Sequence, residues 1–367
     1  EYSCLNNYIK VNILFNFQKI IFVLPAGEPG STSLCHSLVR HTIMQLIILS
    51  ISLVLLIVYA ALLLYYRAAW SAIPTFNPTF QNPNLQPSTF ITVIIPARNE
   101  ASNLPALLSS LNKQTYPKEL FNVIVVDDHS TDETASLAAN ASNGNIKLIR
   151  LQDRLHGTAI NSYKKKAIET AVAETNAELI VTTDADCIVP ENWLSAIAAF
   201  YETEKPEFIV MPVSYREKNN LLEIFQSLDF MTLQGITGAS VYKRFHSMCN
   251  GANLAYTKKA FEAVEGFKGI SHLASGDDML LMHKIYQRHP QGIGYLKSNQ
   301  VIVQTAPMHT WKDFLNQRIR WASKADKYDD QRIFGVLLLV YFFNAWLLIL
   351  PLIALFNLQY SILNTWL

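Results

Sequence analysis

The chain has 367 residues, with 30 Lys or Arg against 29 Asp or Glu, so its formal net charge of +1 gives no general electrostatic reason to bind nucleic acid. Four scattered cysteines, none in a C-x-x-C pair, argue against a disulfide scaffold and a zinc ribbon, and 11% aromatic residues exclude an intrinsically disordered chain. Half of the residues are hydrophobic and only 16% are charged, whereas soluble domains average about 25% charged residues, so membrane segments are expected.

The first long apolar segment, residues 42–66, contains no charged residue. About 20 apolar residues, each rising about 1.5 Å, cross a bilayer core about 30 Å thick. A cleaved signal peptide is the alternative, but its apolar run is usually only about 7–15 residues long. We therefore predict a transmembrane helix over 44–66. Met44 is the expected biological start and residues 1–43 a leader or non-native segment, although the apolar stretch 11–24 leaves a further segment open.

The next stretch, residues 67–87, contains four prolines and many asparagines. Pro-rich chain is stiff and extended, so we predict a spacer between the membrane helix and a folded domain. Residues 88–310 then alternate strand-like and helix-like patterns, which predicts one α/β domain.

Short apolar runs rich in β-branched residues predict buried strands at 91–96, 121–128, 146–151 and 178–186. Helical patterns predict helices at 102–113, 163–173 and 193–201, and one that begins at Asp132 with Ser130 and Thr131 as caps. The alternating order implies a parallel sheet with right-handed crossovers, which binds ligands at the carboxyl ends of its strands.

The second long apolar segment begins at Ile333, and no charged residue follows it. We predict a transmembrane helix over 333–356, kinked at Pro351, with a buried core helix as the alternative, and the start of a further membrane segment over 357–367. Directly before it, residues 311–330 predict an amphipathic interfacial helix, because apolar side chains fall on one side of it and basic side chains lie around them.

Asp184 and Asp186 follow the fourth predicted strand as a D-x-D motif. Two carboxylates two positions apart at a strand end can share a hard divalent cation, and Mg²⁺ or Mn²⁺ keeps places for phosphate oxygens. A solvated loop is the alternative, because D-x-D is common by chance. The position at a strand end favours the metal site.

Two further acidic pairs carry possible chemistry. Asp127 and Asp128 end the second predicted strand, where one acid can cap the next loop and the other can accept from a base N–H or a ribose hydroxyl. Asp277 and Asp278, after Gly276, open a helical pattern, where they are either partners of the helix dipole or a source of a general base. No G-x-G-x-x-G motif follows the first strand, which disfavours a dinucleotide cofactor.

Gln317, Arg320 and Trp321 form a Q-x-x-R-W motif inside the amphipathic segment. One interpretation is membrane anchoring alone, by aromatic and basic side chains. The other is that the arginine and tryptophan face a diphosphate and an acceptor.

Six segments occur in one order: VIIPARNE (93–100), VVDDHSTDET (125–134), TTDADC (182–187), CNGANLAY (249–256), GDD (276–278) and QRIRW (317–321). Together they resemble the family 2 glycosyltransferases, in the membrane-anchored branch that includes cellulose and hyaluronan synthases and ceramide glucosyltransferase. The resemblance runs from about Ile91 to Trp321. It implies an α/β GT-A fold with a mostly parallel central sheet flanked by transmembrane helices, a UDP-linked nucleotide-sugar donor, Mg²⁺ or Mn²⁺, and inversion at the anomeric carbon.

The resemblance also implies site residues. The donor side would consist of Pro96, Arg98, Glu100, Asp127, Asp128, Lys164, Asp184 and Asp186. Within it, Asp128 would contact the base while Asp127 shapes the loop. Asp186 would be the main metal ligand, and Asp184 a ribose or metal contact. Lys164 would be a basic residue near the donor, although Tyr163 stands where the family usually has glycine.

On the acceptor side, Asp278 matches the catalytic base, although Asp277 precedes it where the family often has glutamate. The motif of Gln317, Arg320 and Trp321 would bind the leaving diphosphate and the acceptor. Gly251 and Asn253 would form the acceptor-side wall.

The resemblance predicts a membrane-bound inverting glycosyltransferase that moves a sugar to a lipid or cell-envelope glycan. The alternatives are a processive polysaccharide synthase subunit, a nucleotidyl- or phosphate-transfer enzyme, and a non-catalytic membrane scaffold. A phosphate-transfer enzyme would more often carry a Gly-rich loop, which is absent from the sequence. Nucleotide sugars are cytosolic and basic residues flank the spans, so we expect an integral protein of a bacterial inner membrane with its domain facing the cytoplasm.

Overall fold

The computed structural model describes residues 31–77, 87–142, 144–155, 162–216, 220–244, 248–271, 273, 276–323 and 331–365. The chain forms two compact units, residues 1–57 and 58–367. Helix α2 (Ser31–Ala72) begins in the first unit, and all other described elements belong to the second. The predicted leader lies mostly outside the described residues.

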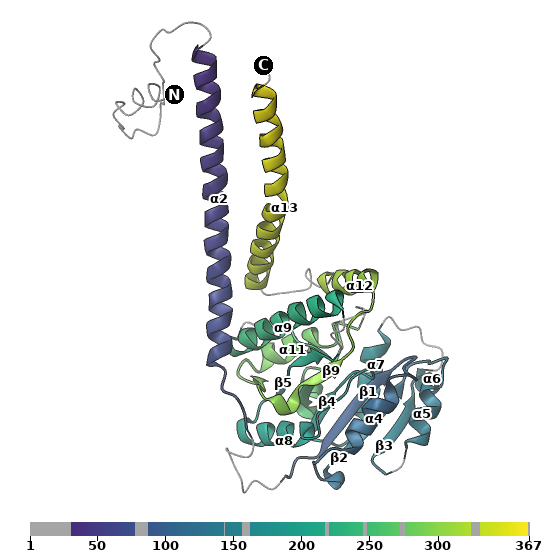
Figure 1. Ribbon diagram of the computed structural model, residues 1–367. Coiled ribbons are helices and arrows are strands. Elements are labelled where there is room, and N and C mark those ends of the chain that lie inside the picture. The colour runs from purple at the N-terminus through teal and green to yellow at the C-terminus, as the bar shows by residue number, and fades with distance from the viewer. Residues whose placement is uncertain are drawn as a thin grey trace. The chain divides into compact units, whose positions relative to one another are not determined.

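Two helices of the described chain are long and apolar enough to cross a membrane, by length and composition alone (Figure 1). They cover Thr42–Ala72 in α2 and Ile333–Leu355 in α13 (Gln331–Thr365), with mean hydropathies of 3.0 and 2.5. In an apolar 18-residue stretch of each span, 0% and 6% of the residues are buried in the structure, which disfavours a buried core helix as the interpretation of the second span.

The helices extend beyond the predicted segments in two places. Helix α2 continues to Ala72, where a spacer was expected to have begun, because the first proline is Pro74 and Trp70 packs against the domain core. Residues 357–365 continue α13 and do not form a separate segment.

A seven-stranded sheet forms the centre of the domain, in the order β3-β2-β1-β4-β7-β5-β8 (Figure 1). These strands are β1 (Ile91–Ala97), β2 (Phe121–Asp127), β3 (Ile146–Arg150), β4 (Leu179–Thr182), β5 (Phe208–Val210), β7 (Leu254–Thr257) and β8 (Ile293–Tyr295). Strands β3, β2, β1 and β4 are parallel, and β7 runs antiparallel to both β4 and β5. The mostly parallel sheet that the sequence predicts is therefore confirmed.

Helices and a small second sheet surround this centre. They are α4 (Leu104–Asn112), α5 (Thr134–Asn140), α6 (Gln152–Leu155), α7 (Tyr163–Ala173), α8 (Trp193–Glu204), α9 (Leu221–Tyr242), α10 (Lys258–Ala263), α11 (Met279–Arg288) and α12 (Trp311–Ala322), with two short 3₁₀ helices at Lys118–Leu120 and Asn299–Val301. Strands β6 (Val213–Tyr215) and β9 (Val303–Thr305) pair in parallel as the second sheet.

The apolar runs become strands because both faces of the sheet are covered. In β1, Val93 and Ile95 pack into one core while Ile94, between them, packs into the other, as the period of two requires. All three are fully buried. Burial of such side chains contributes about 1.5–3 kcal/mol each, which makes β1 a rigid frame for the loops at its carboxyl end.

Two local predictions are wrong. Helix α5 begins at Thr134 and its N-terminus receives no side-chain cap from Ser130 or Thr131. These residues instead bind the preceding loop: Ser130 Oγ accepts from Asn99 N at 3.0 Å, and Thr131 N donates to Asn99 Oδ1 at 2.8 Å. The fourth strand, predicted to reach residue 186, ends at Thr182, so that the D-x-D motif lies in a loop.

Candidate active site

A cavity of about 420 Å³ opens at the carboxyl end of β4, between the loops of the sheet and helices α9, α11 and α12. Its lining residues are Lys164, Asp184, Asp186, Tyr215, Phe230, Asn250, Gly251, Ala252, Asp277, Asp278, Thr305, Ala306, Met308, Gln317, Arg320 and Trp321. Eight predicted site residues, far apart in the sequence, therefore meet here: Lys164, Asp184, Asp186, Gly251, Asp278, Gln317, Arg320 and Trp321.

The loop after β4 brings both carboxylates of the D-x-D motif to the cavity. Asp186 Oδ2 accepts a hydrogen bond from Thr305 Oγ1 at 3.0 Å. Burial, together with the negative charge of Asp184, raises the pKa of Asp186. A cation between the two carboxylates would offset both effects.

The described residues contain no group of three or more His, Cys, Asp or Glu side chains placed to hold a metal ion. The two carboxylates would thus leave most of an octahedral shell to water and phosphate oxygens, which is how Mg²⁺ is usually bound. All donor atoms would be oxygens, as Mg²⁺ and Mn²⁺ prefer. The residues present therefore fit the expected cation.

Lys164, near the start of α7, joins the acids into one network. Its Nζ lies 2.7 Å from Asp184 Oδ1 and 3.3 Å from Asp277 Oδ2. Desolvation alone would lower the pKa of Lys164, but the carboxylates around it raise that pKa well above its ordinary value. A Cβ at Gly251 would lie 3.3 Å from both Lys164 Nζ and Asp277 Oδ2, so glycine leaves these charged groups room.

Asp278 is the N-cap residue of α11, as the helix-dipole interpretation expected, and it also faces the cavity. Its Oδ1 accepts from Met279 N at 2.7 Å and its Oδ2 from Gly251 N at 3.2 Å. Two backbone donors from different elements thus hold the carboxylate plane in one orientation. A carboxylate oxygen has two acceptor sites, so it can accept a hydrogen bond and also take a proton.

Helix α12 supplies Gln317, Arg320 and Trp321 from one face. The Trp321 ring lies 4.3 Å from the Arg318 guanidinium and 6.1 Å from the Phe230 ring of α9, measured to ring centroids. Gln317 Oε1 is buried without a hydrogen-bond partner in the described structure. An unpaired buried acceptor is costly, which makes this oxygen a natural contact for a ligand hydroxyl.

A second polar cluster lies at the carboxyl ends of β1 and β2, outside the cavity lining. Arg98 Nη1 is 3.8 Å from Asp128 Oδ2, and His129 Nδ1 is 3.0 Å from Asp128 Oδ1. Asp127 is 3% exposed, and its Oδ1 has no hydrogen-bond partner in the described part of the chain. The guanidinium of Arg98 lies 6.0 Å from the centroid of the Tyr163 ring.

Pro96 and Glu100 flank this second cluster. Pro96 lies in β1 opposite Val126, and Glu100 follows the strand in the next loop. Burial raises the pKa of Glu100, and so do the negative charges of Asp186 and Asp184. Glu100 therefore lies within electrostatic range of the D-x-D acids.

The structure reveals cavity residues that the sequence motifs did not identify. It also places one predicted acceptor-side residue outside the cavity lining. Thr305, Tyr215 and Phe230 line the cavity, although no motif identified them. Asn253 does not line it: the side chain is fully buried, donates to Pro212 O and Val301 O at 2.7 Å each, and accepts from Trp193 Nε1 at 3.0 Å. Asn253 thus connects core segments and does not form part of the wall.

Comparison with known proteins agrees with this geometry. Residues 92–264 match the family described as "Glycosyl transferase family 2", and residues 179–367 match "Glycosyl transferase family group 2". The second match covers more than half of the chain. The chain belongs to glycosyltransferase family 2.

Individual relatives are distant. The chain is 28% identical to the glycosyltransferase AglE of Haloferax volcanii over 193 residues, which cover 52% of this chain and 59% of that protein. It is 28% identical over 116 residues to the beta-monoglucosyldiacylglycerol synthase of Nostoc sp., covering 32% of this chain and 24% of the synthase. The chain therefore spans well under two thirds of the length of these relatives.

A solved structure supports the fold. The mannosyltransferase PcManGT from Pyrobaculum calidifontis, in complex with GDP-Man and Mn²⁺, superposes with a TM-score of 0.54 at 23% identity, covering 74% of this chain and 72% of that one. The predicted GT-A fold is thereby confirmed.

Proposed function

We propose that the chain is a membrane-bound inverting glycosyltransferase that moves a sugar from a nucleotide-sugar donor, UDP-linked, to a lipid or cell-envelope glycan acceptor. The main support for this proposal is that three sets of side chains line one cavity. They are the D-x-D carboxylates, the oriented carboxylate of Asp278, and Arg320 with Trp321. The relatives' names support the class, since one is a synthase of a glycosylated lipid and one structural neighbour holds a nucleotide sugar with Mn²⁺.

The donor would lie across the carboxyl ends of β1, β2 and β4. Asp128, fixed by Arg98 and His129, faces the base, while Asp127, Pro96 and Glu100 shape the nucleotide pocket around it. Asp186 and Asp184 would hold the divalent cation, which when bound supplies positive charge for the departing diphosphate. Lys164 and Arg320 line the same cavity and add positive side-chain charges to that of the cation.

The acceptor hydroxyl would approach from the side of α9 and α12. Its oxygen bonds to the anomeric carbon as the bond from that carbon to the diphosphate breaks, and Asp278 takes the hydroxyl proton. The fixed carboxylate plane means that little reorientation is needed at this moment. Trp321 and the unpaired Gln317 Oε1 position the acceptor.

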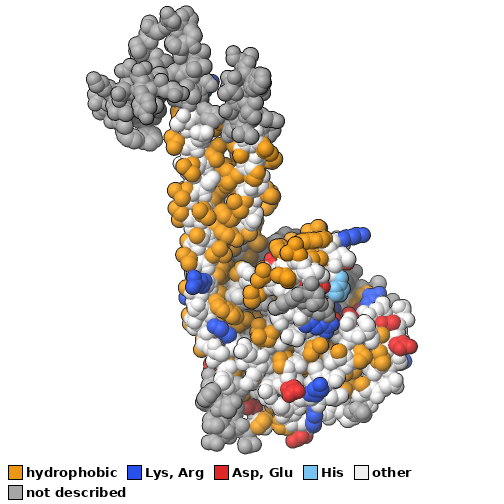
Figure 2. All heavy atoms as spheres, in the orientation of Figure 1, with side chains coloured by type: hydrophobic (Ala, Val, Ile, Leu, Met, Phe, Trp, Pro, Cys, Tyr) orange, Lys and Arg blue, Asp and Glu red, His pale blue; other side chains and the backbone are white. Residues whose placement is uncertain are grey.

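The exposed apolar faces of α9 and α12 support the proposal that the domain lies at a membrane surface. Figure 2 shows hydrophobic side chains gathered over these helices, and the exposed members are Leu221, Ile224, Phe225, Leu228 and Met231 of α9 with Trp311, Leu315 and Ile319 of α12. Water-exposed apolar faces of this extent usually mark an interaction site. In this proposal they lie in the lipid headgroup region, on the cytoplasmic side of a bilayer spanned by α2 and α13.

The test is nucleotide release by the membrane-embedded full chain. A panel of UDP- and GDP-sugars is offered with Mn²⁺, with Mg²⁺ and with EDTA. We expect release from one donor that needs the cation and is abolished in Asp186→Ala, whereas Asp313→Ala, an exposed acid of α12, keeps it. Absence of both release and metal-dependent UDP binding would favour the scaffold alternative.

A further inference from the structure

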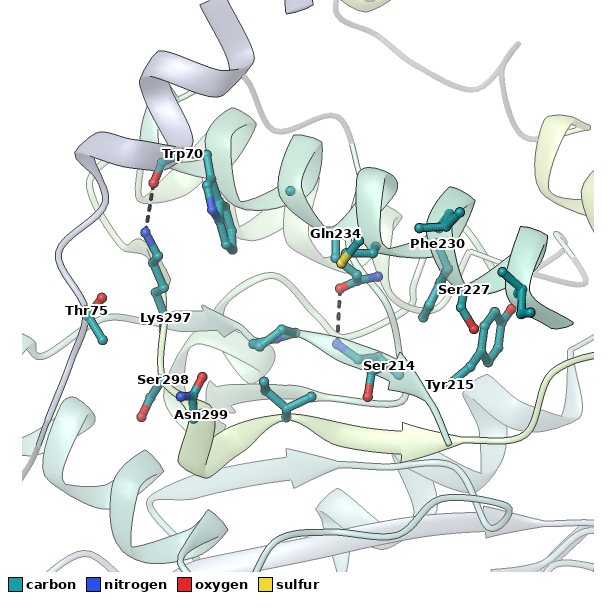
Figure 3. Close-up of a pocket in the computed structure, with 17 residues that line it drawn as sticks. Trp70, Thr75, Ser214, Tyr215, Ser227, Phe230, Gln234, Lys297, Ser298 and Asn299 are labelled. Carbon is teal, nitrogen blue, oxygen red and sulfur yellow. Dashed lines mark hydrogen bonds between the residues drawn. The ribbon is translucent and has the colours of Figure 1, made fainter. Parts of the chain in front are cut away.

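A second cavity, of about 600 Å³, lies beneath α9. In Figure 3 it extends along this helix, with Tyr215, Ser227 and Phe230 at one end and Trp70, Thr75 and Lys297 at the other. Its volume falls in the range of about 300–1,000 Å³ that is typical of ligand pockets. None of the motifs discussed above concerns this cavity.

Two of the polar side chains around the cavity are engaged in bonds that hold the fold together, whereas the buried Ser227 Oγ has no hydrogen-bond partner in the described structure. Lys297 Nζ donates to Trp70 O at 3.0 Å and to Ile73 O at 3.2 Å, and Gln234 Oε1 accepts from Val213 N at 3.2 Å (Figure 3). Most of the remaining wall is apolar: Trp70, Pro212, Val213, Ile224, Leu228, Phe230, Met231 and Ile302. A sugar or nucleotide would find few hydrogen-bond partners here, whereas a hydrocarbon chain gains stability simply by leaving water.

The cavity adjoins the candidate active site. Tyr215 and Phe230 line both cavities, and their stacked rings, 4.6 Å apart at the centroids, form the shared wall. A molecule with its hydroxyl group at Asp278 would have to pass these rings to lay an apolar extension in the second cavity.

The open side of the cavity is apolar as well. Ile224, Leu228 and Met231 line it and are 44%, 56% and 64% exposed. They belong to the α9 face that we place in the headgroup region. A chain leaving the bilayer would thus enter between apolar side chains and would not cross water.

We propose that this cavity holds the hydrocarbon chain of a lipid acceptor while its hydroxyl group lies at Asp278. The inference rests on the proposed function and specifies its acceptor as a lipid. A second protein is a poorer occupant, because the cavity extends inward under one helix to the active-site wall and is not a flat surface.

Gly235 of α9 offers a way to fill the cavity without disturbing its walls. It lines the cavity, and a Cβ built on it meets no atom within 4 Å. Gly235→Leu therefore places a side chain in free space. Gly335, in α13, also meets nothing within 4 Å and does not line the cavity, so Gly335→Leu is the matched control.

The experiment uses the full chain in phosphatidylcholine nanodiscs and a stearic acid with a mid-chain diazirine. After irradiation, mass spectrometry measures label on Val213 of β6, which is 3% exposed and lines this cavity but not the candidate active site, whereas Tyr215 lines both. We expect label on Val213 in the wild type and a roughly tenfold loss in Gly235→Leu, because about two methylenes lose their burial. Label on α13 serves as the internal standard.

The controls separate filling from other effects. Gly235→Ala, which removes the glycine but fills little space, and Gly335→Leu should both keep the label on Val213. If Gly235→Leu unfolds, Ser227→Leu fills the opposite end and should give the same loss. An unlabelled Val213 in the wild type, or equal label in the filled variants, overturns the proposal.

Nucleotide release is measured on the same wild-type sample. Release without label on Val213 overturns the chain-binding cavity and leaves the transferase intact. Label without release from any donor and without metal-dependent UDP binding overturns the proposed function, and with it the acceptor role of the bound lipid.

Discussion

Replacing Asp278 with asparagine isolates the proton-accepting role that we propose for this carboxylate. The change keeps the shape of the side chain and removes its ability to take a proton. General-base assistance is worth about 10²–10⁴ in rate, or about 3–5 kcal/mol in the barrier, so we expect sugar transfer to fall by that factor. Donor affinity should stay within about twofold, because we propose that Asp278 acts on the acceptor and not on the donor.

The structure also gives the stability cost of this variant. Asp278 accepts from Met279 N and from Gly251 N, and an asparagine can present its single oxygen to only one of them. The shorter bond, 2.7 Å to Met279 N, should be kept, and the loss of the other costs about 1 kcal/mol. That loss is too small to unfold a domain of ordinary stability.

Two measurements distinguish these effects. Calorimetry with UDP and Mn²⁺ reports donor binding, and release of UDP from the donor sugar reports turnover. Asp313→Asn is the matched control, since this acid is exposed and accepts from Thr310 Oγ1 outside the cavity. Turnover near the wild-type level in Asp278→Asn would remove Asp278 from the role of base.

Three further outcomes are expected. Thr305→Val removes the hydrogen bond that orients Asp186, so Mn²⁺ affinity should fall roughly tenfold or more in calorimetry. Gly238→Ala places a Cβ 2.6 Å from the Trp70 ring, so chemical unfolding should show a loss of about 1–3 kcal/mol. Burial and neighbouring acids raise the pKa of the Cys187 thiol well above its ordinary value, so at pH 8 it should stay protonated and resist iodoacetamide in the native protein, as mass spectrometry can show.

Each of these has a control within the chain. Thr310→Val removes a hydroxyl that caps α12 outside the cavity and should leave Mn²⁺ affinity unchanged. Gly235→Ala, in the same helix as Gly238 but with free space around it, should be stabilising by about 0.5–1 kcal/mol. Cys187 should react once the protein is unfolded. An unaltered Mn²⁺ affinity in Thr305→Val, an equal effect of the two glycine substitutions, or rapid native labelling of Cys187 would each contradict the reasoning.

Much of the sheet was predictable because the information is local. The β-branched runs that became β1, β2 and β4 are buried on both faces, and such strands are recognisable without knowledge of their neighbours. The edge strand β3 buries Ile146 and Ile149 and exposes Lys147 and Arg150. The acidic residues at the strand ends were likewise predictable as a group, since carboxyl ends of parallel strands meet at one edge. The start of α5 was not, because Ser130 and Thr131 bind Asn99 of a neighbouring loop and do not cap the helix.

What the sequence did not reveal depends on long-range packing. Thr305 contacts Asp186 across 119 positions, and a threonine in a short strand carries no signal of that partner. Helix α9, which lines both cavities, has apolar residues on its exposed side as well as its buried side: Leu221 is 78% exposed and Leu222 only 7%. Its pattern therefore lacks the one-sided stripe of a surface helix, and only the three-dimensional arrangement shows that Phe230 lies beside Tyr215.

The charges around Lys164 should determine the order in which the divalent cation and the nucleotide sugar bind. Among the described lining residues, four carboxylates, those of Asp184, Asp186, Asp277 and Asp278, face the two cations of Lys164 and Arg320. With all of them ionised, the empty cavity carries two excess negative charges, which repel a diphosphate. One divalent cation cancels that excess, so the kinetic scheme should be ordered: the ion enters first or together with the donor, and a free nucleotide sugar meets an electrostatic barrier until it does.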